Sequence, residues 1–141
     1  QVELGLIPYY MFIARDTGAQ HYYGVTLNQA WNVFRKAYNQ VSGLARTVRG
    51  PSMSANPGKV LVNGVARIKN QKVFVLSFLQ GRNPEWVGKP FFANYDENAK
   101  WLEDLIPAFD DDVFFYEEEF EEMINKAKPH KLHFDSYKTT A

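Results

Sequence analysis

Residues 41–59 read VSGLARTVRGPSMSANPGK and lie between a helix-like pattern and strand-like sequence. The stretch holds two arginines, three serines, three glycines and two prolines, and it ends in Lys59. Loops carry backbone shapes and reactive side chains that a packed core does not tolerate. A long loop without periodicity of its own is usually functional or disordered. We therefore predict an active-site loop over residues 44–59, with the rest of the chain as its support.

The composition is that of a globular chain. It has 141 residues, of which 45% are hydrophobic and 16% aromatic, and this suffices for the core of one domain or of a fragment of one. No run of 18 apolar residues occurs, so the sequence predicts no membrane span. With no cysteine, the chain can form no disulfide, thiolate metal site or cysteine nucleophile, and a reducing cytoplasm fits this composition.

The charges are unevenly distributed along the chain, although the net charge is zero. Residues 1–90 carry eleven Lys and Arg against three Asp and Glu, whereas residues 91–141 carry five against thirteen. This asymmetry predicts a basic surface around the loop, suited to an anion, and an acidic C-terminal part. Two complementary faces that dock on each other would explain it equally well.

The N-terminal part predicts a strand followed by a helix. Residues 4–14 (LGLIPYYMFIA) are almost entirely apolar, which is typical of a strand buried on both faces. Pro8 favours an edge position, a bulge or a strand that starts nearer Tyr9. Thr26 and Gln29 match a capping box, and apolar residues then recur at helical spacing over residues 27–42, with Gly43 as the expected left-handed C-cap.

The C-terminal part predicts an antiparallel meander and acidic helical sequence. Strand-like residues 60–62 and 65–68 flank Asn63-Gly64, a strong two-residue hairpin signal, and residues 72–79 form a third run. Residues 114–126 predict an acidic helix, whose carboxylates we interpret as a solvated face rather than a metal site. Residues 128–141 read as a flexible tail.

Lys59 is the candidate reactive residue. It follows Asn56-Pro57-Gly58, so a tightly turning backbone presents one amine at the start of a strand. Neighbouring positive charge and partial burial favour a neutral, nucleophilic amine. Arg46 and Arg49 suit the bidentate binding of a phosphate or carboxylate. A solvated surface lysine is the alternative interpretation of Lys59.

Several motifs in order resemble the C-terminal third of the lysine 2,3-aminomutase family of radical SAM enzymes. They are Ile7-Pro8-Tyr9-Tyr10, His21, Val41-Ser42-Gly43 and Pro57-Gly58-Lys59. The resemblance implies an α+β fold, in which the last βα unit of a partial (βα)6 barrel (residues 1–43) and the loop precede the meander and acidic helices (residues 60–127). It also implies that the chain is a C-terminal portion of a longer protein.

The family's chemistry implies roles for particular residues. Lys59 would be the catalytic residue that binds pyridoxal phosphate, with Ser42 and Arg46 as further cofactor ligands. SAM and a [4Fe–4S] cluster would act in the full-length protein only, because the cluster motif requires cysteines and this chain has none. The 141 residues alone are therefore expected to be inactive.

Departures from the family pattern predict the substrate. The lysine-specific enzymes place aspartates where this chain has Arg15 and Ser52. A cation in place of an anion repels lysine and attracts an acidic amino acid. The predicted substrate-binding residues follow the end of the first strand or lie in the loop: Arg15, Asp16, Arg49 and Ser52. A turn with solvated charges is the alternative for Arg15 and Asp16.

Two other functions are considered. One is a non-catalytic binding or oligomerisation module whose basic loop meets an acidic partner, and we expect a homo-oligomer in either case. The other is nucleic-acid binding, against which the net neutrality weighs; its basic residues would be Arg46, Arg49, Lys69 and Arg82.

Overall fold

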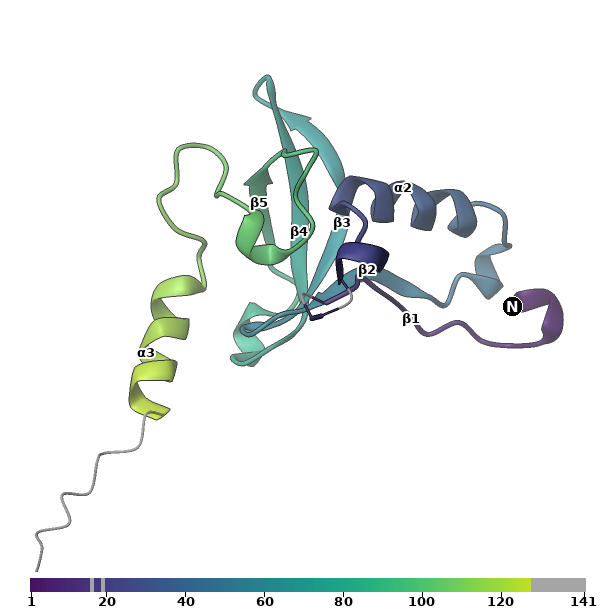
Figure 1. Cartoon of the computed structure of the whole chain (residues 1–141), viewed down its shortest axis with the longest axis horizontal. Coiled ribbons are helices and arrows are strands. Elements are labelled where there is room, and N and C mark those ends of the chain that lie inside the picture. The colour runs from purple at the N-terminus through teal and green to yellow at the C-terminus, as the bar shows by residue number, and fades with distance from the viewer. Residues whose placement is uncertain (16, 19, 128–141) are drawn as a thin grey trace, which may run out of the picture.

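The computed structural model describes residues 1–15, 17–18 and 20–127. Its centre is a five-stranded sheet in the order β1-β2-β3-β4-β5 (Figure 1). The strands are β1 (Tyr10–Phe12), β2 (Arg49–Ser54), β3 (Gly58–Ile68), β4 (Gln71–Gly81) and β5 (Pro90–Asn94). The helices are α1 (Gln20–Tyr23), α2 (Leu27–Tyr38) and α3 (Glu117–Ala127), with the 3₁₀ helices η1 (Val2–Leu4), η2 (Gly43–Ala45), η3 (Pro84–Trp86) and η4 (Leu102–Asp104).

The sheet is mixed and open, so the predicted partial (βα)6 barrel is wrong. β1 and β2 pair in parallel, but the β2–β3, β3–β4 and β4–β5 pairs are all antiparallel. A parallel pair needs a crossover of about a dozen residues or more, usually a helix. The segment containing α2 provides one, whereas the connections from β2 to β5 are short and each reverses the chain direction.

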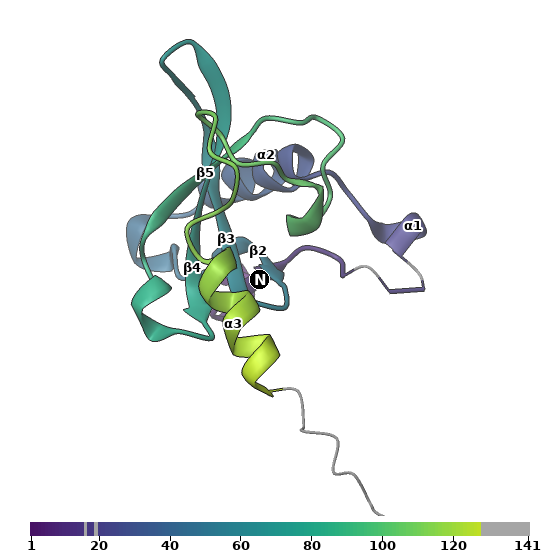
Figure 2. The ribbon, with the colours of Figure 1, turned by 90° about the vertical axis from the view of Figure 1, so that its left-hand side faces the viewer.

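The apolar N-terminal run forms a short edge strand, and the expected burial on both faces is wrong. Leu4 is 81% exposed and Ile7 is 78% exposed. Only residues 10–12 pair with β2, because Pro8 has no N–H to donate and favours a strand that starts after it. Figure 2 shows α1 set apart from the sheet, and Tyr22 and Tyr23 in it are 79% and 75% exposed.

Helix α2 confirms the predicted capping box but ends earlier than predicted. The Gln29 backbone N–H donates to Thr26 Oγ1 over 3.2 Å, and the Thr26 N–H donates to Gln29 Oε1 over 3.0 Å. The helix stops at Tyr38 with Asn39 as its right-handed C-cap, and Gly43 instead begins η2. The predicted loop over residues 44–59 is also wrong, because β2 occupies its middle and β3 begins at Gly58.

The hairpin between β3 and β4 turns at Lys69-Asn70 and not at Asn63-Gly64. Lys69 and Asn70 have φ values of 46° and 65°, as a type I′ turn requires at both central residues. Asn63 and Gly64 instead lie at a bulge inside β3. At φ 155°, an added Cβ on Gly64 would lie 3.2 Å from the Trp31 ring, so glycine there allows α2 to approach the strand closely.

One hydrophobic cluster joins α2, the sheet and the segments that follow β5. Phe78 on β4 is its centre, because its ring lies 5.0–6.2 Å from four others. Leu27 and Ala30 bring α2 into the same cluster. The four rings around Phe78 are those of Trp86, Phe91, Phe115 and Tyr116.

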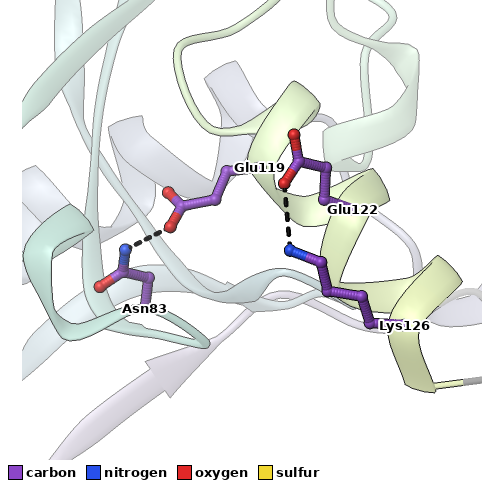
Figure 3. A network of polar contacts seen from close by, with 4 residues as sticks. All are labelled: Asn83, Glu119, Glu122 and Lys126. Atoms are coloured by element: carbon purple, nitrogen blue, oxygen red, sulfur yellow. Dashed lines mark hydrogen bonds and ion pairs between the residues drawn. The ribbon is translucent and has the colours of Figure 1, made fainter.

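Helix α3 is attached to the η3 loop by one carboxylate (Figure 3). Glu119 Oε1 accepts a hydrogen bond of 2.7 Å from Asn83 Nδ2, and Glu119 Oε2 accepts one of 2.8 Å from Trp86 Nε1. Trp86 is only 2% exposed. Phe120 and Met123 pack against the core, whereas Glu122 pairs with Lys126 on the outer side of the helix.

We expect Glu119→Ala to lower the free energy of unfolding by about 2 kcal/mol, because a buried indole N–H loses its acceptor. Urea denaturation followed by tryptophan fluorescence measures the change. Glu118→Ala is the matched control on the same helix, and as an exposed substitution it should change stability by less than about 0.5 kcal/mol. Equal losses in the two variants would contradict the role of Glu119.

Candidate functional site

Lys59 is the second residue of β3, where the β2–β3 hairpin turns. Ala55 and Gly58 exchange backbone hydrogen bonds of 3.0 and 3.2 Å across Asn56-Pro57. Gly58 has φ 154°, and an added Cβ there would overlap the carbonyl oxygen of Gln80. A glycine is therefore required for β3 to approach β4 at this point, and this fixes the position from which the Lys59 side chain extends.

The Lys59 ammonium lies over an aromatic pair on the edge strand. Its Nζ is 4.3 Å from the centre of the Tyr10 ring and 5.4 Å from that of Phe12. The two rings stack on each other, with centres 5.2 Å apart and an interplanar angle of 24°. Cation–π contact of this kind attracts a lysine without neutralising its charge.

Arg49 belongs to the same cluster. It pairs with Tyr10 across the parallel β1–β2 ladder, and its guanidinium carbon lies 5.7 Å from the centre of the Tyr9 ring. Hydrogen bonds from Tyr9 and then Arg49 lower the pKa of the Tyr10 phenol below its ordinary value of 10.0. Desolvation opposes this shift, and the charges of Lys59 and Arg49 add lesser contributions to it. The cluster therefore stabilises negative charge at the Tyr10 oxygen.

We expect Tyr10 to ionise below pH 10.0 in the folded protein. Because the folded state releases this proton more readily than the unfolded chain, stability should rise with pH between the lowered pKa and the ordinary value. Tyrosine-selective ¹³C NMR follows the titration. Arg49→Met should return the Tyr10 pKa toward its ordinary value, and Arg46→Met, which removes a guanidinium placed over Tyr38, should not. A Tyr10 titration unmoved by Arg49→Met would contradict this assignment.

Two of the hollows beside the β2–β3 hairpin adjoin each other. One has a volume of about 330 Å³ and is lined by Lys59 and by Arg82, with Gln80 and Gly81 of β4. The other has a volume of about 390 Å³ and is lined by Arg15 with Trp101, Glu103 and Asp104. Both lie in the range of small-molecule sites. The three residues that line both hollows are Ser54, Ala55 and Asn56.

Arg82 is held in place by the hairpin itself. Its Nε donates to the Asn56 carbonyl over 2.8 Å, and its backbone N–H donates to the Pro57 carbonyl over 3.0 Å. Its guanidinium carbon lies 5.7 Å from the centre of the Phe120 ring on α3. Two cationic side chains, those of Lys59 and Arg82, therefore line one hollow.

The structure separates the other predicted residues from Lys59. Arg46 lies over Tyr38, and its Nε donates to the Val41 carbonyl over 3.1 Å. Ser42 is exposed ahead of η2 and lines neither hollow. Ser52 is fully buried with its Oγ 3.5 Å from the Met11 carbonyl, so it does not face a ligand from solvent. Asp16 lies outside the described residues.

Sequence reasoning missed the aromatic pair and the role of Arg82. Tyr10 and Phe12 are two positions apart, so both rings lie on one face of a strand. This signal was overlooked because residues 4–14 were interpreted as buried on both faces. Arg82 lies 23 positions after Lys59, and only the pairing of β3 with β4 brings the two together. No local pattern in the sequence carries that information.

The chain has no identified relative. No family model matches its sequence, no curated protein matches it, and no solved structure matches its fold. The resemblance to the aminomutase family therefore stays a hypothesis that depends on the motifs quoted above. Within residues 1–15, 17–18 and 20–127, no three His, Asp or Glu side chains gather as a metal site would need. None of the helices described there has the length and apolarity to cross a bilayer.

Proposed function

We propose that the Lys59 hollow binds pyridoxal phosphate in an amino-acid isomerase of the aminomutase type. The observation that carries the proposal is that Lys59, which bears an amine, and Arg82, which bears a guanidinium, line one hollow of about 330 Å³. Among the described residues no carboxylate pairs with Lys59, whose side-chain contacts are to the rings of Tyr10 and Phe12. We also propose a cytoplasmic location, which the absence of cysteine allows.

The residues present fit this cofactor. The Lys59 amine would bond to the aldehyde carbon, whose oxygen would leave as water, and the Arg82 guanidinium, already positioned by Asn56, would bind the phosphate by charge-assisted hydrogen bonds. Ser54 and Asn56 supply further polar atoms in the same hollow. When bound, pyridoxal phosphate supplies an electron-accepting ring next to the nitrogen of the amino acid.

The adjoining hollow suits an acidic amino acid. Arg15 would bind the side-chain carboxylate, and Glu103, which lines the same hollow, would accept hydrogen bonds from the ammonium group of the incoming amino acid before its nitrogen reaches the cofactor. Asp104 is less available, because its Oδ2 already accepts hydrogen bonds of 2.9 and 3.0 Å from the backbone of Lys100 and Trp101. Charges of both signs in one hollow favour a zwitterion over a simple anion.

SAM and the [4Fe–4S] cluster do not fit these residues. The chain has no cysteine to bind iron, and the described residues show no alternative ligand cluster. We assign no step of the reaction to those groups here.

A second candidate is a binding module without covalent chemistry. The 330 Å³ hollow is open to solvent and cationic, and Arg49 adds a third cation beside Tyr10. Such a site binds a phosphate or carboxylate reversibly through charge alone. If the protein is such a module, ligands with and without an aldehyde group should bind equally tightly.

Absorbance titration with pyridoxal phosphate tests the proposal. The unaltered protein should give a saturable band that Lys59→Met abolishes, and Arg82→Met should weaken binding at least about tenfold through the lost phosphate contact. Lys69→Met, in the exposed β3–β4 turn, is the control and should have no effect. Binding of inorganic phosphate without any aldehyde-dependent band would favour the binding module and reject the cofactor assignment.

A further inference from the structure

The β5 edge of the sheet carries an aromatic hollow that the proposed function does not use. It has a volume of about 440 Å³, and its apolar walls include Phe91, Phe92, Phe109, Val113, Phe114 and Phe115. Val113 and Phe115 are each 45% exposed. The hollow is separate from the two that flank the β2–β3 hairpin, with which it shares no lining residue.

The rim of this hollow is acidic and its backbone is strained. Asp111 lines it between Asp110 and Asp112, against a single cation, Lys89. Phe109 and Asp110 both have φ 63°, a left-handed conformation that residues other than glycine rarely adopt. Strained residues of this kind cluster at ligand-binding segments. The hollow therefore combines apolar walls with a net negative rim.

The opposite side of the molecule carries a matching projection. Leu44, at the centre of η2, is 98% exposed, which is extreme for a leucine. Arg46 follows it at the end of the same turn, held over Tyr38, and Arg49 follows at the start of β2. An exposed apolar side chain flanked by fixed cations is complementary to an apolar hollow with an acidic rim.

One chain cannot bring these two surfaces together. The η2 turn leads directly into β2, next to the β1 edge, whereas the hollow lies on β5 and the segment after it. The centre of a five-stranded sheet separates them, and β2 to β5 at about 4.8 Å per strand span about 14 Å before any side chain is added. Figure 1 shows the same separation, with α2 on one side of β3 and β4 and the loop that leads into α3 on the other.

We propose that the η2 turn of one copy of this chain docks into the aromatic hollow of a second copy. Leu44 fills the apolar cavity, and Arg46 and Arg49 lie against Asp110, Asp111 and Asp112. The occupant is a second copy because the chain itself carries both complementary surfaces. The contact joins two different surfaces, so it is heterologous, and such contacts continue into rings or chains of subunits rather than stopping at a symmetric pair.

Sedimentation velocity at increasing protein concentration tests the proposal. The protein should sediment faster as its concentration rises, and added salt should weaken the association because charges flank the contact. Leu44→Asp removes the apolar side chain and places a negative charge against the acidic rim, so it should weaken association at least about tenfold. Asp111→Lys should do the same from the side of the hollow. Tyr22→Asp alters a comparably exposed residue on α1 and should change nothing.

Mixing the two defective variants gives the decisive result. The L44D variant keeps an intact hollow and the D111K variant keeps an intact η2 turn, so an equimolar mixture should form one-to-one pairs and no larger species. Circular dichroism confirms that both variants fold, as expected for substitutions at exposed positions. A protein that stays monomeric at every concentration would overturn the proposal. Association that survives Leu44→Asp, or folded variants that fail to pair in the mixture, would overturn it as well.

Discussion

Phe78→Ala should lower the free energy of unfolding by about 4 kcal/mol, the largest loss we expect from a single core substitution. Phe78 is 1% exposed and contacts four other aromatic rings. Removing it deletes buried apolar surface and leaves a cavity, because rings supplied by η3, β5 and the segment before α3 cannot all move into the gap. Urea denaturation measures the loss, with the same dependence of unfolding free energy on urea concentration used for both proteins.

Phe115→Ala provides the comparison for this prediction. Phe115 touches Phe78 and Phe91 at 6.2 and 5.7 Å between ring centres but is 45% exposed, so its loss should cost about 1 kcal/mol. Similar losses for the two substitutions would show that Phe78 is not the centre of the core. The cluster joins the sheet to α3, so a large effect at Phe78 should also release α3.

Gly58→Ala should destabilise the protein by about 3 kcal/mol and should disturb the Lys59 hollow at the same time. Its backbone has φ 154°, and an added Cβ would overlap the Gln80 carbonyl oxygen and lie 2.9 Å from the Gly81 Cα. Those atoms belong to the backbone of β4 and cannot move aside as a flexible side chain would. The β2–β3 hairpin must shift, and Lys59 shifts with it.

Gly88→Ala separates conformational strain from steric overlap. Gly88 also has a positive φ, 78°, but an added Cβ there would meet no atom within 4 Å. Its substitution should cost about 1 kcal/mol and leave pyridoxal phosphate binding unchanged. If Gly58→Ala binds the cofactor as well as Gly88→Ala does, the hairpin does not position Lys59.

Local signals in the sequence predicted part of the local structure. Thr26 and Gln29 located the start of α2 correctly, because a capping box depends only on residues three positions apart. Asn63-Gly64 was misleading, because that glycine serves the close approach of Trp31 and not a turn. The true turn, Lys69-Asn70, lies where the long pairing of β3 with β4 ends.

The errors in the global fold have a different cause. A strand followed by a helix and a return strand is compatible with a barrel or with an open sheet, and the strands after β2 decide between them. The candidate site shows the same limit. Lys59 was found from its turn, but Tyr10 and Arg82 reach it only through the β1–β2 and β3–β4 pairings. Ser52 could not be recognised as buried before β2 was known to be a strand.

Peptide mapping after borohydride reduction tests the central claim, the covalent attachment of pyridoxal phosphate to Lys59, most directly. Trypsin does not cut after a modified lysine, so attachment at Lys59 should leave residues 50–67 as one uncleaved, labelled peptide. We expect most of the label in that peptide at stoichiometric cofactor, and we expect Lys59→Met to remove it. Label spread evenly over the ten lysines of the chain, or absent from residues 50–67, would show that Lys59 is not the attachment site.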